Sequence, residues 1–163
     1  MKILHMLAAP AAGGAEVYVK DLVVEAKKSG HTPAILFISN AESIGRSFEY
    51  EKLFLQELTD LDIPCFILPT GSRRNLLKGI LAYRKYVSKF SPDSHLVTGL
   101  VYQFFSFLRK PKVVYTHHNS VISINKLLFK LLMRIPHGYV GISNACNKFL
   151  KQFTPLNSTL KTI

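Results

Sequence analysis

Residues 2–29, KILHMLAAPAAGGAEVYVKDLVVEAKKS, predict the fold of this protein. The apolar run at residues 2–8 is typical of a core strand, and residues 15–29 carry apolar side chains at helical spacing. Two adjacent glycines, Gly13 and Gly14, stand in the turn between them. A strand, a glycine turn and a helix in this order form the first part of a βαβ unit.

The rest of the chain repeats this alternation. Further strands are expected at residues 32–38, 63–68, 95–98, 112–116 and 139–142. Helical patterns separate or follow them, at residues 47–61, 73–90, 101–108, 124–134 and 144–153. This order predicts an α/β, Rossmann-like, doubly wound and mostly parallel six-stranded sheet with helices on both faces. Residues 1–153 form this domain, and residues 154–163 are interpreted as the start of a connection because Pro155 and Asn157 break the pattern.

The composition is that of one globular domain. The chain has 163 residues, of which 48% are hydrophobic and 19% charged, which excludes a disordered chain or a disulfide scaffold. Its two cysteines, Cys65 and Cys146, match no metal-finger spacing and are interpreted as packed thiols in a reducing compartment. No apolar run approaches the roughly 20 residues that a membrane-spanning helix needs. A cytoplasmic location is therefore expected.

The charges are distributed unevenly along the chain. There are 21 Lys and Arg against 10 Asp and Glu, and the last carboxylate is Asp93. The later part of the chain therefore offers neither a carboxylate pair nor an oxygen-ligand metal site, and no metal site is expected. A basic excess suits a partner that carries phosphate or anionic lipid. Nucleic acid is disfavoured because the basic residues are spread over several helices and no RRM, KH or helix-turn-helix signature occurs.

The turn around Gly13 and Gly14 is the first candidate site. Two glycines let the backbone approach a ligand, and the N–H groups at the start of the following helix favour an anion such as phosphate. The segment has neither the third glycine of a dinucleotide fingerprint nor the Lys-Ser/Thr of a P-loop. The alternative is a tight strand-to-helix turn with Glu16 placed favourably in the first helical turn.

The second candidate site is His117, His118 and Asn119, directly after the expected strand at 112–116. Adjacent side chains of an extended segment point to opposite sides, so we expect one histidine to face a cleft and the other to pack. An imidazole there can donate a hydrogen bond, act as a base or pair with an anion. A polar loop without a function is the alternative.

Ser143 follows the strand expected at residues 139–142, where it is suited to cap the next helix. A hydrolase nucleophile is disfavoured because no second glycine completes a G-x-S-x-G elbow.

The helix expected at residues 73–90 has an apolar stripe and a basic face. The stripe, which should pack on the sheet, is made of Leu76, Ile80, Tyr83, Val87 and Phe90. The basic face consists of Arg74, Lys78, Lys85 and Lys89, with Arg73 and Arg84 on its flank. This face is either solvated or lies against anionic lipid head groups or a phosphorylated acceptor.

Five of these segments, in order, resemble the N-terminal domain of glycosyltransferase family 4 enzymes. They are KILH at residues 2–5, GGAE at 13–16, PD at 92–93, VVYTHHN at 113–119 and YVGISN at 139–144. The resemblance implies the GT-B architecture, in which two Rossmann-like domains face a cleft. It also implies that the N-terminal domain receives the acceptor, while a C-terminal domain holds the nucleotide sugar and transfer retains the anomeric configuration without a metal.

The resemblance also suggests roles for individual residues. Gly13 and Gly14 match the loop that approaches the diphosphate and sugar of the donor, and His118 matches the active-site histidine that contacts the donor sugar. Ser143 matches a serine common before the last helix of the domain. Substrate contacts are further expected from the neighbouring Glu16, His117 and Asn119. Many members have histidines where this chain has Leu96 and Thr98, so the acceptor role usually assigned there is not carried over to these positions.

The expected function is therefore that of the acceptor-side domain of a retaining, metal-independent glycosyltransferase. Such an enzyme moves a sugar from a nucleotide-sugar co-substrate to a glycan or lipid-linked acceptor, as in polysaccharide or lipopolysaccharide biosynthesis. Residues 154–163 would begin the connection to a C-terminal donor-binding domain, and the 163 residues alone would be inactive. Peripheral contact with the inner face of an anionic membrane is expected. The alternative is a standalone Rossmann-like module that binds a phosphorylated small molecule or an anionic membrane without catalysis.

Overall fold

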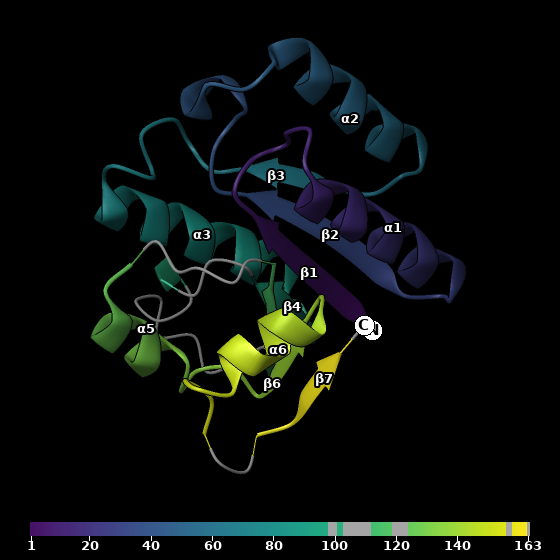
Figure 1. Ribbon diagram of the computed structural model, residues 1–163. Helices are drawn as coiled ribbons and strands as arrows, with labels where there is room; N and C mark the ends of the chain where they lie inside the picture. Colours follow the sequence, from purple (N-terminus) through teal and green to yellow (C-terminus); the bar gives the residue numbers. More distant parts are fainter. Residues whose placement is uncertain (98–100, 103–111, 119–123, 156–157, 163) are drawn as a thin grey trace.

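The computed structural model describes residues 1–97, 101–102, 112–118, 124–155 and 158–162. Within them, one parallel sheet runs in the order β3-β2-β1-β4-β5-β6-β7 (Figure 1). The strands are β1 (Lys2–Leu7), β2 (Thr32–Phe37), β3 (Cys65–Ile67), β4 (Ser94–Val97), β5 (Lys112–His117), β6 (Gly138–Gly141) and β7 (Leu160–Thr162). The helices are α1 (Gly14–Lys28), α2 (Phe48–Asp60), α3 (Leu76–Phe90), α5 (Lys126–Leu132) and α6 (Asn144–Leu150), with a short 3₁₀ turn at Glu42–Ile44. The α/β, Rossmann-like fold expected from the sequence is confirmed.

Helices cover both faces of the sheet because alternate residues of each buried strand face opposite sides. On β2, Ile35 and Phe37 pack with α1 and α2, while Ala34 and Leu36 belong to the other cluster. The first cluster includes Val19, Val23, Phe54 and Leu58 from the two helices. The second is larger and takes in Tyr83 and Val87 of α3, Phe129 and Leu132 of α5, and Leu150 of α6.

The expectation of six strands was wrong, because β7 adds a seventh at the edge of the sheet. It lies within residues 154–163, which the sequence suggested were a loose connection. Leu160 pairs with Tyr139 in parallel register, and the Tyr139 N–H donates to the Thr159 carbonyl at 3.0 Å. Three residues show no measurable periodicity in a sequence, but they suffice for backbone pairing once β6 presents a free edge. Leu160 also packs against the core.

The expected helix at 73–90 begins three residues later than predicted. The Asn75 side chain caps α3 by accepting a hydrogen bond from the Lys78 N–H at 3.0 Å. A turn with Gly71 at φ +84° precedes it, so Arg73 and Arg74 lie outside the helix. Tyr83 and Val87 are buried as predicted, whereas Leu76 in the first turn is exposed. The helix expected at 101–108 falls mostly outside the described residues, of which 101 and 102 are helical.

Gly79 allows α3 to approach its neighbours closely, and the substitution Gly79→Ala should destabilise the protein. A Cβ atom there would lie 2.5 Å from the Tyr102 ring and 2.9 Å from the Ser72 carbonyl oxygen. Overpacking of this kind costs about 1–3 kcal/mol, more than the gain of up to ~1 kcal/mol in helix propensity. Urea unfolding should therefore give a lower midpoint, while Ser88→Ala on the exposed side of α3 should not. An unchanged midpoint for Gly79→Ala would contradict this packing.

Candidate functional site

The carboxyl ends of parallel strands meet at one edge of the sheet, where ligands bind in folds of this type. The loop after β1 reaches this edge and enters α1 at Gly14. Gly13 is the N-cap in an extended conformation. Its carbonyl accepts the first hydrogen bond of the helix, from the Val17 N–H at 3.1 Å. The N–H groups of Gly14 and Ala15 therefore have no partner within the helix. Gly14 is exposed, and a Cβ atom there would meet nothing within 4 Å.

The Glu16 side chain lies over Gly13. A Cβ atom at position 13 would meet only the end of this flexible side chain, which can move aside. Burial raises the pKa of Glu16, and a backbone hydrogen bond and the charge of Arg46 oppose that rise. A carboxylate in the first turn also stabilises the helix dipole. Glu16 thus lies beside the turn, and its predicted contact with a substrate remains a prediction.

His118 lies against the same helix. Its ring is 5.5 Å from that of Tyr18, between centroids, with the planes at 69°. Tyr18 is one helical turn beyond Gly14, so the glycine turn and His118 lie at the same edge of the sheet. Burial lowers the pKa of His118, and its Nε2 atom, which is itself buried, has no hydrogen-bond partner among the described residues. A neutral imidazole with a free ring nitrogen can hydrogen-bond a ligand hydroxyl.

His117 has different surroundings. It is buried, stacks on Phe149 with centroids 5.1 Å apart, and its Nδ1 atom lies 3.0 Å from the Tyr115 hydroxyl. The pKa of His117 is lowered mainly by burial, and the proximity of His118 lowers it further. The structure thus places one histidine in the core and the other beside α1, as alternation along a strand predicts. A role of His117 in binding remains a prediction, and Asn119 lies outside the described residues.

Ser143 is the N-cap of α6, and its Oγ atom accepts a hydrogen bond from the Cys146 N–H at 3.2 Å. The predicted cap is therefore present. A contact between Ser143 and a substrate remains a prediction.

The predicted basic face is divided into two parts. Arg73 and Arg74 lie in the turn before α3, while Lys85 and Lys89 are exposed further along the helix. Lys78 lies between them, and its Nζ atom donates to the Thr70 carbonyl at 2.9 Å. The division arises because the Asn75 cap starts the helix after the two arginines.

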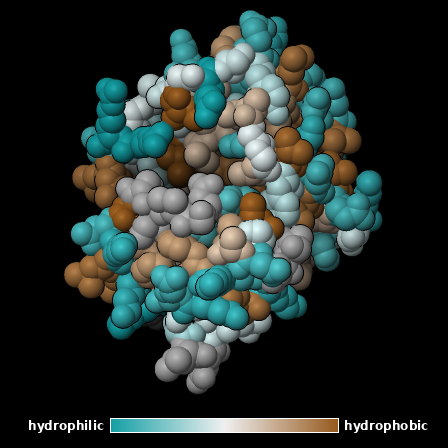
Figure 2. All heavy atoms as spheres, viewed as in Figure 1, coloured by the Kyte–Doolittle hydropathy of each residue, from teal (hydrophilic) through white to brown (hydrophobic). Residues whose placement is uncertain are grey.

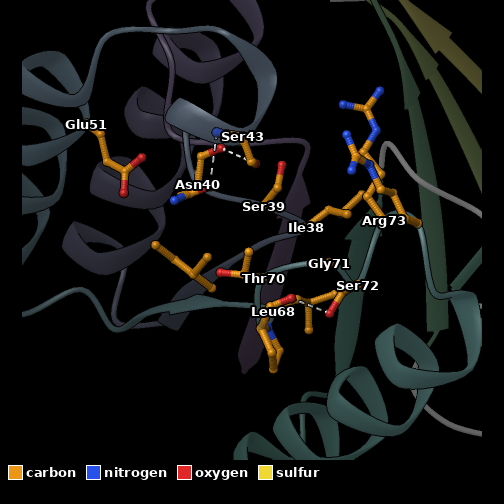
Figure 3. A pocket seen from close by; sticks show the side chains of 13 residues that line it. Ile38, Ser39, Asn40, Ser43, Glu51, Leu68, Thr70, Gly71, Ser72 and Arg73 are labelled. Carbon is orange, nitrogen blue, oxygen red and sulfur yellow. Dashed lines mark hydrogen bonds between the residues drawn. The ribbon is translucent and has the colours of Figure 1, made fainter.

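A cavity of about 530 Å³ lies where β2 and β3 end (Figure 3). The residues after β2 and those after β3 line it, together with Glu51 of α2. No motif in the sequence marks this cavity, although the rule that ligands bind at strand ends applies equally to Ser39, Asn40 and Thr70. The signal that could have indicated it is the basic pair Arg73 and Arg74, which the sequence pattern places on a helix face. Among the described residues, no three His, Cys, Asp or Glu side chains are grouped to hold a metal ion.

His5 is also a buried histidine, and the sequence pattern does not single it out. It lies on β1, is 3% exposed, and burial lowers its pKa to about 4. Between pH 6.5 and about 4 the unfolded chain therefore binds a proton that the folded protein does not, so stability is lost as the pH falls.

Acidification should consequently destabilise the protein through His5. A pKa of about 4 in place of 6.5 corresponds to about 3 kcal/mol, lost progressively below pH 6.5. Urea unfolding at pH 7 and pH 4.5 measures the loss, which His5→Leu should reduce by about 2 kcal/mol. Met6→Leu, on the opposite face of β1, is the control. An equal pH dependence in His5→Leu and Met6→Leu would contradict this role.

The fold is that of a Rossmann-like domain, and comparison with solved structures relates it to half of the GT-B fold. HepE of Anabaena, crystallised with UDP-glucose, matches all of this chain at a TM-score of 0.72 and 16% identity. The lipopolysaccharide outer core galactosyltransferase WaaB matches 99% at 0.69 and 14% identity. UDP-GlcNAc 2-epimerase from Neisseria meningitidis, bound to UDP-GlcNAc, matches 98% at 0.65 and 14% identity.

The matched region is 43%, 44% and 46% of these three proteins, so the chain spans less than half of their length. No protein-family description and no curated protein matches the chain. Within the described residues, none of the helices has the length and apolar character needed to cross a membrane.

Proposed function

We propose that this chain is the acceptor-side domain of a retaining, metal-independent glycosyltransferase of family 4. Transfer from a nucleotide sugar to a glycan or lipid-linked acceptor would require a second, donor-binding domain. The observation that carries the proposal is the contact between Tyr18 and His118, which brings the histidine to the helix that Gly13 and Gly14 begin. Structures of this fold in complex with UDP-glucose or UDP-GlcNAc support it.

The proposed chemistry follows from these groups. As the nucleoside diphosphate leaves, negative charge grows on its phosphate oxygens, and donors that point there in advance lower the barrier. The unpaired N–H groups of Gly14 and Ala15 would hydrogen-bond the donor, and the dipole of α1 favours an anion there. Neutral His118 would hydrogen-bond the sugar and orient its anomeric carbon toward the acceptor. The donor-binding domain would supply the cations.

A donor screen of the complete gene product tests this function. The assay measures release of nucleoside diphosphate from nucleotide sugars, with and without glycan or lipid-linked acceptors. Release that depends on an acceptor is expected, and the 163-residue chain alone should release none. Conversion of the nucleotide sugar without an acceptor would indicate an epimerase instead. Absence of any turnover, together with specific binding of a phosphorylated small molecule, would indicate a standalone binding module.

Contact with an anionic membrane is a second proposal, supported by the outer face of α3. Leu77 and Leu81 are 68% and 59% exposed, and Arg84 and Lys85 lie beside them on the same face. Leu127 and Leu131 of α5 are also exposed. Figure 2 shows hydrophobic side chains next to hydrophilic ones at the left edge of the molecule, over α3 and α5. Exposed leucines flanked by basic residues are typical of helices that lie in a membrane interface.

Reversing the charge of Lys85 and Lys89 together should therefore weaken binding at least about tenfold to vesicles that contain anionic phospholipid. The reason is that each basic residue near such a surface contributes to the attraction. Sedimentation with vesicles measures this binding. The control is the pair Lys28→Glu and Lys52→Glu, on the helices of the opposite face. Equal binding by Lys85→Glu/Lys89→Glu and the control would remove α3 from this proposal.

A further inference from the structure

The cavity at the ends of β2 and β3 opens on the same edge of the sheet as the glycine turn, because the sheet is parallel. It lies on the β2–β3 side of β1, whereas His118 follows β5 on the other side. Its volume of about 530 Å³ is within the range typical of small-molecule sites. The glycine turn and this cavity are therefore neighbouring sites on one surface.

Hydrogen bonds within the protein hold the walls of this cavity. The Ser39 hydroxyl donates to the Ala8 carbonyl at 3.2 Å, and the Asn40 Oδ1 atom accepts from the Ser43 N–H at 3.2 Å. On the other side, Ser72 is buried and donates to the Pro69 carbonyl at 2.6 Å. Lys78 holds the Thr70 carbonyl. Both loops are thus fixed before any ligand arrives, which lowers the entropic cost of binding.

Several polar groups of this cavity are not used in holding the walls. Within the described residues, no hydrogen bond or ion pair engages the guanidinium groups of Arg73 and Arg74, the Asn40 amide N–H₂ or the Thr70 hydroxyl. Figure 3 shows Arg73 at one end of the cavity and Glu51 at the other, with Asn40 and Thr70 between them. The cavity is therefore cationic at one end, neutral and polar in the middle, and anionic at the other.

Glu51 defines the end opposite the arginines. It is 7% exposed, and its carboxylate accepts a hydrogen bond from the Ala41 N–H. Within the described residues it forms no ion pair with Lys or Arg. A buried carboxylate of this kind repels a ligand that is anionic along its whole length, such as a polyphosphate, and accepts hydrogen bonds from hydroxyl groups.

We propose that this cavity binds a sugar that carries one anionic group, a phosphate monoester or a carboxylate. The forked guanidinium groups of Arg73 and Arg74 match the oxygens of such a group, while Asn40, Thr70 and Glu51 face the sugar hydroxyls. If the chain has the proposed function, this anionic sugar is the acceptor, so the inference rests on that function. The donor then lies at the glycine turn and the acceptor beside it.

Binding is measured without a nucleotide sugar, so that it does not depend on transfer. The complete gene product, labelled with ¹⁵N, is titrated with glucose 1-phosphate, glucuronic acid, glucose and inorganic phosphate. The amide signals of Asn40, Thr70 and Gly71 should shift with the two anionic sugars at concentrations at least tenfold lower than with glucose or phosphate. Whichever of the two anionic sugars binds more tightly identifies the anionic group as phosphate or carboxylate.

The variant Arg73→Gln/Arg74→Gln should bind the anionic sugars no more tightly than glucose. Arg84→Gln, which removes an exposed cation of α3 outside the cavity, is the matched control and should bind as the unaltered protein does. Glu51→Gln retains an oxygen for the Ala41 N–H and should weaken binding of glucose 1-phosphate while leaving that of inorganic phosphate unchanged. Equal affinity for glucose and glucose 1-phosphate, or full affinity in Arg73→Gln/Arg74→Gln, would overturn the proposal.

These titrations separate the two proposals. Binding of an anionic sugar here without transfer by the complete gene product would contradict the proposed function and leave the cavity assigned. Transfer to a neutral acceptor, with no binding of anionic sugars here, would contradict only the inference about the cavity.

Discussion

His118→Ala is expected to lower the rate of sugar transfer by the complete gene product about 100-fold or more, with little change in stability. His118 lies beside the helix that starts at the glycine turn, and its Nε2 atom has no partner among the described residues. Loss of one pre-positioned hydrogen-bond donor in an active site typically costs about 10²- to 10³-fold in rate. Initial rates with saturating donor measure the effect.

Two further variants show whether the loss of rate in His118→Ala comes from the imidazole nitrogens. His118→Phe keeps an aromatic ring against Tyr18 but removes both ring nitrogens, so it should be as slow as His118→Ala. His31→Ala, between α1 and β2 at the opposite edge of the sheet, should retain the normal rate. Normal transfer by His118→Phe would show that the ring only packs on Tyr18, and the proposed role of the imidazole would be abandoned.

Gly14→Ala is expected to leave folding intact and to weaken binding of the donor at least tenfold. The exposed position has no atom within 4 Å of an added Cβ, and alanine is the better helix former. A ligand diphosphate that approaches the first turn of α1 needs the space that the methyl group would fill. The structure therefore separates the two effects: the methyl group fits the protein but not the complex.

The measurement pairs the dissociation constant of the nucleotide sugar with the urea midpoint. Ser29→Ala, at the far end of α1, is the control and should change neither quantity. An unaltered dissociation constant in Gly14→Ala would place the donor away from this turn. A fall in the urea midpoint would contradict the open surroundings of Gly14.

Most of the fold could be predicted because it depends on patterns that repeat over many residues. The strand expected at 2–8 ends one residue beyond β1, and the helix expected at 15–29 is displaced by one residue from α1. The placement of His117 and His118 on opposite sides followed from alternation along β5. Such features need only local geometry, which the sequence contains.

Features that depend on contacts between distant segments were not predictable in this way. β7 forms because β6 offers it an edge, and three residues carry no periodic pattern. Arg73 and Arg74 appeared to continue a helix until the Asn75 cap placed them beside the loop after β2. The low pKa of His5 depends on its burial in β1, which lies between β2 and β4 in the sheet. Each of these needs the tertiary structure.

A crystal structure of the complete gene product with its nucleotide sugar tests the central claim most directly. We predict that the diphosphate or sugar lies within about 3 Å of the Gly14 N–H and of a ring nitrogen of His118, as hydrogen bonding requires. A donor bound elsewhere, with no contact to the first turn of α1 or to His118, would contradict the account.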